Sequence, residues 1–251
     1  LLKFSVPLLI GNIAQMLYST VDAVIVGEYI GDEALSAVGV SMPIQHLFLV
    51  FFMAVGSAVT VMVAQYFGAR DYDHLGDTIG NSITLIAVIS VVITAVATPL
   101  TGSLLRLMNT PPETYDMAVA YLMILFLGAA GNGFYNVLSG ILRGLGESVF
   151  PLLILLLTVI LNTILDIWFV SGLHMGIAGA AWATIISQSI SAVLCLIKIM
   201  RIRSIVKIKP KMLLLKRRIV GHIVRLGVPI SLQMGIMTVS IMFVQSLVNS
   251  M

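Results

Sequence analysis

Long apolar stretches separated by short polar turns dominate this sequence. Seven of them are long enough for a helix to cross a bilayer, which takes about 20 mostly apolar residues. They cover residues 4–28, 41–67, 78–105, 114–142, 149–170, 176–200 and 219–250. Turn signals such as Gly31-Asp32 and Pro111-Pro112 separate them. We therefore expect an all-α integral membrane protein.

The first apolar stretch carries polar side chains on one face of its predicted helix. Gln15, Tyr18 and Asp22 follow Pro7 and Gly11 at steps of three or four residues. Lipid cannot satisfy an amide, a phenol and a carboxylate, so this face should line the bundle interior or an aqueous cavity. Pro7 removes one backbone hydrogen bond and should bend the helix. The alternative is a shorter helix with Asp22 at the water interface.

A second polar face lies on the fifth stretch, where Thr158, Asn162 and Asp166 follow one another at steps of four. The first and fifth helices should both run outward, which places Asp22 about 9 Å from the outer end of its helix at 1.5 Å per residue. The sixth helix should run inward and carry Thr184 at a similar depth. Four oxygen-bearing side chains are therefore expected to meet in the outer half of the membrane.

Oxygen ligands of this kind suit a hard cation, whereas soft metals prefer Cys or paired His, which these positions lack. Two acids close together in a dry site also disfavour full ionisation of both, so one of them can accept a proton. We expect a coupling site for H⁺ or Na⁺ formed by Asp22, Asn162, Asp166 and Thr184. Two unrelated acids at the membrane edge are the alternative.

Other spans also carry polar residues at helical spacing, at Asn132 and Asn136 in the fourth and at Gln188 in the sixth. Polar and small residues serve helix packing in membranes as well as ligand binding. Both roles therefore stay open for these three side chains.

Composition narrows the class of protein further. Of the 251 residues, 59% are hydrophobic and 10% are charged, against about 25% charged in soluble domains. A single Cys excludes a disulfide scaffold. The formal net charge of +3 does not indicate a nucleic-acid partner, because the basic residues gather in one loop. We expect no enzyme activity and no cofactor beyond the coupling ion.

The basic residues also predict orientation. Counted by alternate sides of the membrane, thirteen Lys and Arg residues fall on one side and only Arg106 on the other. An excess of this kind marks the cytoplasmic side. We expect the N-terminus and the basic loop at 201–218 to lie there, in the cytoplasmic membrane. That loop is expected to be a solvated linker, with contact to anionic lipid headgroups as the alternative.

A short repeat supports a boundary at this loop. The segment KFSVP, which ends at Pro7, recurs as RLGVP, which ends at Pro229, and each starts a span from the cytoplasmic side. The repeat therefore predicts two halves that have the same orientation in the membrane. The second copy places Val244 where the first has Asp22, so cation chemistry on this helix should belong to the first half alone.

We therefore expect a six-helix lobe over residues 1–200, a basic inter-lobe loop over 201–218, and the first helix of a second lobe over 219–251. The sequence starts at Leu1 and stops at Met251 inside an apolar stretch. We interpret it as a fragment whose partner, the rest of the second lobe, belongs to the same full-length chain.

Several segments together resemble the multidrug and toxic compound extrusion (MATE) family. They are VDAVIVGEYIGDEALSAVGVSMPI, AQYFGARD, ILRGLGESVFP, and LNTILDIWFV followed by GIAGAAWATIISQ. Each motif is weak by itself, but the combination is specific and the likeness covers the whole chain. It is greatest to prokaryotic members, with the DinF-like branch as a candidate.

The resemblance implies twelve helices in two six-helix lobes that export organic cations against an inward flow of H⁺ or Na⁺. It also implies that the first-lobe cation site falls on the four residues named above, with Gln15 and Tyr18 on the cavity wall and Pro7 at the bend. We add Asn132, Asn136 and Gln188 as candidate residues of the substrate cavity. This chain, with one lobe and one helix, is not expected to transport alone.

Two other functions stay open. A lipid-linked oligosaccharide flippase of the same superfamily should have a more cationic cavity. An intramembrane aspartyl protease would use two acids, but the Gly-Asp pairs Gly31-Asp32 and Gly76-Asp77 fall in predicted loops. The sequence does not separate H⁺ from Na⁺ coupling or identify the substrates.

Overall fold

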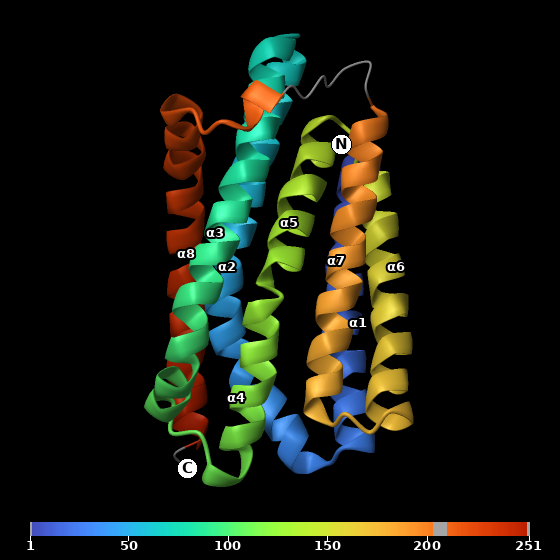
Figure 1. Cartoon of the computed structure of the whole chain (residues 1–251), viewed down its shortest axis with the longest axis vertical. Coiled ribbons are helices and arrows are strands. Elements are labelled where there is room, and N and C mark those ends of the chain that lie inside the picture. Colours follow the sequence, from blue (N-terminus) through green and yellow to red (C-terminus); the bar gives the residue numbers. More distant parts are fainter. Residues whose placement is uncertain (1, 203–209, 250–251) are drawn as a thin grey trace.

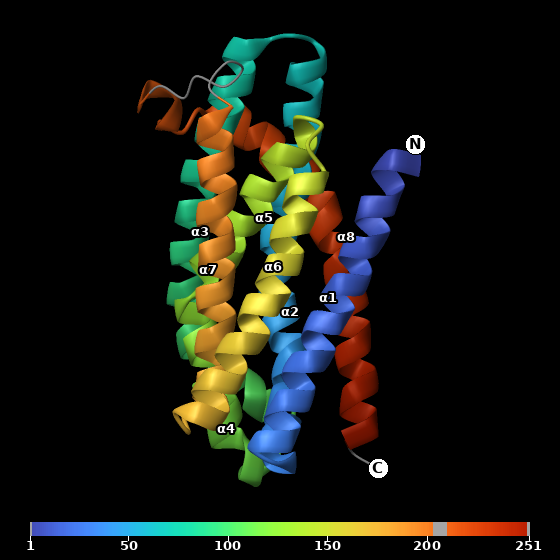
Figure 2. The same cartoon turned by 90° about the vertical axis from the view of Figure 1, so that its right-hand side faces the viewer.

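The computed structural model describes residues 2–202 and 210–249, which form a bundle of long helices (Figures 1 and 2). In chain order the elements are α1 (Leu2–Tyr29), α2 (Asp32–Gly68), α3 (Tyr72–Leu107), α4 (Pro112–Leu127), α5 (Ala129–Gly144), α6 (Val149–Asp166), the π-helix η1 (Ile167–Gly172), α7 (Ile177–Arg201), the 3₁₀-helix η2 (Pro210–Leu213) and α8 (Arg217–Asn249). The described residues contain no β-strand, which confirms the all-α prediction.

The predicted spans correspond to these helices. Five are long and apolar enough to cross a membrane, namely α2, α3, α6 together with η1, α7 and α8. The helices α4 and α5 are long and apolar enough only when taken together, and they meet at an angle of 48°. Helix α1 has 28 residues, which gives a length of about 42 Å at 1.5 Å per residue. The fourth predicted span therefore consists of two helices, a break that the hydrophobic pattern did not predict.

Close approach of α7 accompanies this break. Gly128 lies between α4 and α5, and the Ile185 side chain of α7 occupies the space that a Cβ of Gly128 would need. A Cβ on Gly131 of α5 would lie 2.6 Å from the Ser189 Oγ of α7. The two glycines therefore let α7 contact the bend directly, and this places the first turn of α5 against α7.

Helix α5 runs through the middle of the bundle and packs against α2, α3 and α7 (Figure 1). Its contact with α2 is made by backbone. A Cβ on Gly140 would lie 2.6 Å from the Gly56 carbonyl oxygen. The Thr60 hydroxyl donates across the seam to the Gly140 carbonyl at 3.1 Å. Small residues at such a seam let two membrane helices approach closely.

Two helices begin earlier than the apolar pattern predicted. Helix α2 begins at Asp32 rather than 41, and α3 begins at Tyr72 rather than 78. Hydropathy detects only the part of a helix that lies in hydrocarbon, so it misses polar first turns. Asp32 and Glu33 suit the positive end of the α2 dipole, and the Asp71 side chain caps α3 by accepting a bond from the His74 amide at 3.1 Å.

The described end of the predicted 201–218 loop is fastened to α3. Asn81 is fully buried, and its amide donates to the Met212 carbonyl at 3.1 Å while its oxygen accepts from the Lys216 amide. The Lys216 ammonium also pairs with Asp77, and Thr84 donates to the Leu213 carbonyl at 2.7 Å. We call these contacts the connector clamp. Residues 203–209 of the loop lie outside the described part.

Helix α8 follows the connector clamp and packs along α2 and α3. Ile219, Ile223 and Gly227 are buried at steps of four, whereas Leu232 and Ile236 beyond them are exposed. The first half of α8 therefore packs closely against the preceding helices.

Candidate functional site

Two carboxylates from distant parts of the sequence meet inside the bundle. Asp22 projects from α1 and is 5% exposed, and Asp166, the last residue of α6, is 0% exposed. Their carboxyl groups lie close enough to interact electrostatically. An ionised carboxylate has no hydrogen to donate, so a hydrogen bond between two acids needs one of them to carry a proton.

The other predicted cation residues surround this pair. Asn162 is buried one helical turn before Asp166 on α6, and Thr184 is buried on α7. The Tyr18 hydroxyl, from α1, donates to the Thr184 Oγ1 at 3.3 Å. Helices α1, α6 and α7 thus bring the predicted residues together, with Tyr18 as part of the same cluster.

Several polar atoms of this cluster have no hydrogen-bond partner among the described residues. They are Oδ1 of Asp22, both carboxylate oxygens of Asp166, and Nδ2 of Asn162. Neither acid forms an ion pair with a described basic side chain. Buried polar groups are nearly always bonded, so unpaired oxygens gathered at one place indicate a site for a ligand with positive charge.

The ligand set fits a small monovalent cation or a proton. Across residues 2–202 and 210–249, no group of three or more Cys, His, Asp or Glu residues could hold a metal ion. Two carboxylates with an amide and a hydroxyl supply oxygen atoms, which Na⁺ accepts. A proton needs fewer oxygen ligands than Na⁺ does, because a single carboxylate oxygen of either acid can hold it.

The local backbone at Asp166 is unusual. The α-helical pattern of α6 ends there and continues as the π-helix η1. This π-helix ends the span, and the loop that leads to α7 follows it. Nothing in the hydrophobic pattern of 149–170 predicted this change, because it alters hydrogen bonding without changing which residues are apolar.

Tyr121 is a phenol near the site that the sequence pattern did not reveal. It lies on α4, is 3% exposed, and interacts electrostatically with Asp22, Asp166 and Tyr18. Its neighbours in AVAYLMILF are apolar, so it belongs to no polar stripe. The one available signal was a phenol in the interior of a spanning segment.

A row of hydroxyl groups continues from the cation cluster along α6 and α7. Ser187 donates to the Thr184 carbonyl at 3.0 Å, and Ser191 donates to the Ser187 carbonyl at 2.8 Å. The Ser191 hydroxyl also bonds the Thr158 hydroxyl of α6. The bonds of Ser187 and Ser191 to carbonyls stay within α7, and the Thr158–Ser191 pair links α6 to α7.

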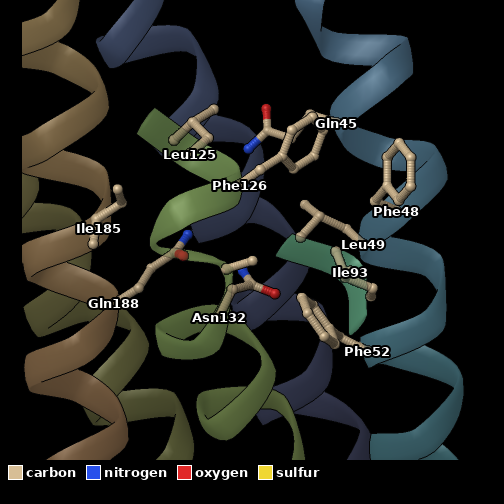
Figure 3. Close-up of a pocket in the computed structure, with 11 residues that line it drawn as sticks. Gln45, Phe48, Leu49, Phe52, Ile93, Leu125, Phe126, Asn132, Ile185 and Gln188 are labelled. Atoms are coloured by element: carbon tan, nitrogen blue, oxygen red, sulfur yellow. The ribbon is translucent and has the colours of Figure 1, made fainter. Parts of the chain in front are cut away.

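A small pocket lies beside the α4–α5 bend, between α2, α3 and α7 (Figure 3). Its volume of about 20 Å³ is enough for roughly one water molecule. Asn132 and Gln188, both predicted for the substrate cavity, line it together with Gln45, which the sequence pattern did not reveal. The rest of the wall is apolar and includes Phe48, Leu49, Phe52, Ile93, Leu125, Phe126 and Ile185.

The other predicted cavity residues lie elsewhere. Asn136 does not line the pocket, and its amide donates to the Asn132 Oδ1 at 2.9 Å, which orients that side chain. Gln15 is exposed on α1. The side chain of Pro7 lies outside the described ones, so the bend stays a prediction.

The MatE family model matches residues 7–168. A probable multidrug resistance protein of Bacillus subtilis, YpnP, is 34% identical over 250 residues, which cover 100% of this chain and 56% of that protein. DNA damage-inducible protein F of Escherichia coli is 27% identical over 205 residues, covering 82% of this chain and 44% of the relative.

Solved structures of transporters also resemble this chain. A MOP superfamily transporter from Pyrococcus furiosus has a TM-score of 0.89 and 31% identity, covering 96% of this chain and 54% of that one. The chain therefore spans about half the length of the relatives it matches. Members of the matching family are transporters rather than enzymes. The sequence match, the helical fold and the whole-chain similarity show that this chain belongs to the MatE family of multidrug and toxic compound extrusion transporters.

Proposed function

We propose that this chain forms the first half of a cation-coupled antiporter that exports organic cations across the cytoplasmic membrane. The observation that carries the proposal is the pair of buried carboxylates, Asp22 and Asp166, with no basic partner among the described residues. An acid inside a membrane is costly and marks an ion pathway by default. The relatives named for multidrug resistance support the class of cargo.

The site exchanges one positive charge for another. With both acids ionised, the cluster attracts H⁺ or Na⁺, and Asn162 and Thr184 supply further oxygen ligands. Once that cation is bound, less negative charge is left to attract an organic cation. Binding of the coupling ion and of the substrate therefore oppose each other, and this opposition is the free-energy coupling that an antiporter needs.

The pocket beside the α4–α5 bend offers uncharged side chains that a substrate could contact. Gln45, Asn132 and Gln188 bring amides, and Phe48 and Phe126 pack edge to face with ring centroids 4.9 Å apart. Aromatic faces attract organic cations. The lining contains no Lys or Arg, which favours an exporter of cations over a flippase for an anionic lipid-linked oligosaccharide.

Ethidium efflux by a full-length transporter that contains this sequence tests the proposal. Asp22→Asn should abolish efflux while the protein still inserts into the membrane. Asp32→Asn, at an exposed acid in the first turn of α2, removes the same charge outside the site and should export normally. Normal ethidium export by the Asp22→Asn variant would contradict the proposal.

Separate gradients in vesicles identify the coupling ion. Efflux driven by a pH gradient alone assigns H⁺, and efflux driven by a Na⁺ gradient alone assigns Na⁺. An intramembrane protease would instead cleave its substrate after both gradients had been dissipated.

We further propose the lobe boundaries and orientation predicted above. Residues 1–200 form one lobe, 201–218 the cytoplasmic connection, and 219–251 the first helix of a second lobe, with the N-terminus in the cytoplasm. The distribution of Lys and Arg supports this orientation.

A further inference from the structure

A second group of charges lies away from the cation site, where α5 ends, α6 begins and α7 ends (Figure 1). Arg143 lies in the last turn of α5, and Lys198 lies in the last turn of α7. Both are partly buried. Among the described residues, neither forms an ion pair.

The two cations converge on one place. Helix α5 packs against α7, and Arg143 of α5 lies near Cys195 of α7. Lys198 follows Cys195 by three residues, on the same face of that helix. The Lys198 ammonium lies over the Phe150 ring, 4.9 Å from its centroid, in the first turn of α6. Positive charge from two helices therefore gathers at the start of a third.

The nearby acid does not neutralise this charge. The Glu147 carboxylate accepts a bond from the Phe150 amide at 3.3 Å, so it caps the start of α6. A partly buried guanidinium without a counter-ion is unfavourable, so the place suits an anion.

An apolar surface leads away from the two cations. Phe150 shares a helical face with Leu153 and Leu157, which are 55% and 43% exposed. Ile190 lies about two turns before Lys198 on α7 and is 39% exposed. Helices α6 and α7 pack side by side, and the contact between Lys198 and Phe150 shows where these two helices meet.

We propose that this seam between α6 and α7 binds an anionic phospholipid. Its phosphate lies between the Arg143 guanidinium and the Lys198 ammonium, and its acyl chain follows Leu153, Leu157 and Ile190. Basic pockets between spanning helices bind lipid headgroups in this way, and the planar guanidinium donates two parallel hydrogen bonds to phosphate. This site is independent of the proposed ion coupling.

Native mass spectrometry of the purified full chain tests the proposal, with phosphatidylglycerol and phosphatidylcholine of identical acyl chains as probes. Phosphatidylglycerol should bind more tightly than phosphatidylcholine. Arg143→Gln and Lys198→Gln should each weaken its binding by about tenfold, as expected for loss of a charge-assisted hydrogen bond. The matched control is Arg106→Gln, because Arg106 also lies over an aromatic ring, that of Tyr115, at the other end of the bundle; it should leave binding unchanged.

If Arg143→Gln does not fold, Lys198→Gln and Arg143→Lys decide the question, and the lysine variant should keep part of the binding because it keeps the charge. Equal binding of the two lipids, or undiminished phosphatidylglycerol binding by Lys198→Gln, would overturn the site. Inorganic phosphate that displaces phosphatidylglycerol at low millimolar concentration would show a free-phosphate site instead, and would overturn the lipid assignment.

Discussion

At the scale of single residues, the candidate site consists of polar groups whose partners lie on other helices. Tyr18 reaches Thr184 across 166 positions of sequence, and Asp22 faces Asp166. Each group alone would be an expensive burial in a membrane. Together they leave carboxylate oxygens unpaired, which is what a cation site requires and a purely structural cluster would avoid.

Replacing Thr184 by Val removes the hydroxyl that bonds Tyr18 and leaves the volume of the side chain nearly unchanged. The change removes the acceptor of the Tyr18 bond and should lower the free energy of unfolding of the chain by about 1–3 kcal/mol, because a buried donor loses its partner. Thr163→Val is the matched control, since the Thr163 hydroxyl bonds only the Val159 carbonyl of its own helix; its effect should stay within about 0.5 kcal/mol. Equal destabilisation in denaturant titrations would contradict this role.

Residues that follow one another at helical spacing were the ones that sequence could predict. Asp22, Asn162 and Asp166 each belong to a polar stripe in an apolar stretch, and the structure places them together. Tyr121 and Gln45 have no such stripe around them, and only packing from other helices reveals them. Asn136 belongs to a stripe but bonds its own neighbour Asn132, because spacing defines a face of a helix and not what that face contacts.

At the scale of helices, glycine and backbone contacts decide how closely the spans pack. The predicted spans follow the order of the observed helices, with α4 and α5 in place of the fourth span, because twenty apolar residues can satisfy their backbone in lipid only as a helix. The bend at Gly128 and the π-helix after Asp166 depend on tertiary contacts and hydrogen bonding. Hydropathy averages over such details and therefore could not predict them.

Gly140→Ala should weaken the contact between α2 and α5. Its Cβ would lie 2.6 Å from the Gly56 carbonyl oxygen, where neither backbone can move easily, so we expect a loss of about 1–3 kcal/mol in the free energy of unfolding. Gly39→Ala has open space around its Cβ and should gain up to about 1 kcal/mol from helix propensity. Opposite signs in thermal denaturation are the expected result, and a shared sign would contradict it.

The connector clamp makes a prediction about proteolysis. Asn81→Leu removes three hydrogen bonds, to Asp77, Met212 and Lys216. At about 1 kcal/mol for each bond, trypsin should cleave after Lys211 and Lys216 at least about fivefold faster. Asp77→Ala removes only a partly exposed ion pair and should have a smaller effect. Cleavage at the wild-type rate in Asn81→Leu would show that the clamp does not hold this segment.

At the scale of the whole molecule, charge predicts how the bundle crosses the membrane. Thirteen of the fourteen Lys and Arg residues fall on one side by alternate counting. Cysteine labelling tests this in a Cys195→Ser background. Lys211→Cys should react with an impermeant maleimide only in inside-out vesicles, and Leu107→Cys, at a position 79% exposed, only in right-side-out ones. The reverse pattern would overturn the orientation.

Exchange of cations at the Asp22–Asp166 pair is the central claim, and ion release on substrate binding measures it most directly. Ethidium added to purified full-length transporter in weakly buffered detergent should release H⁺, seen with a pH indicator, or Na⁺, seen with a sodium electrode. The double variant Asp22→Asn/Asp166→Asn should release neither ion, and Asp32→Asn should behave as wild type. Ethidium binding without release of either ion by the wild type, or equal release by the double variant, would contradict the account.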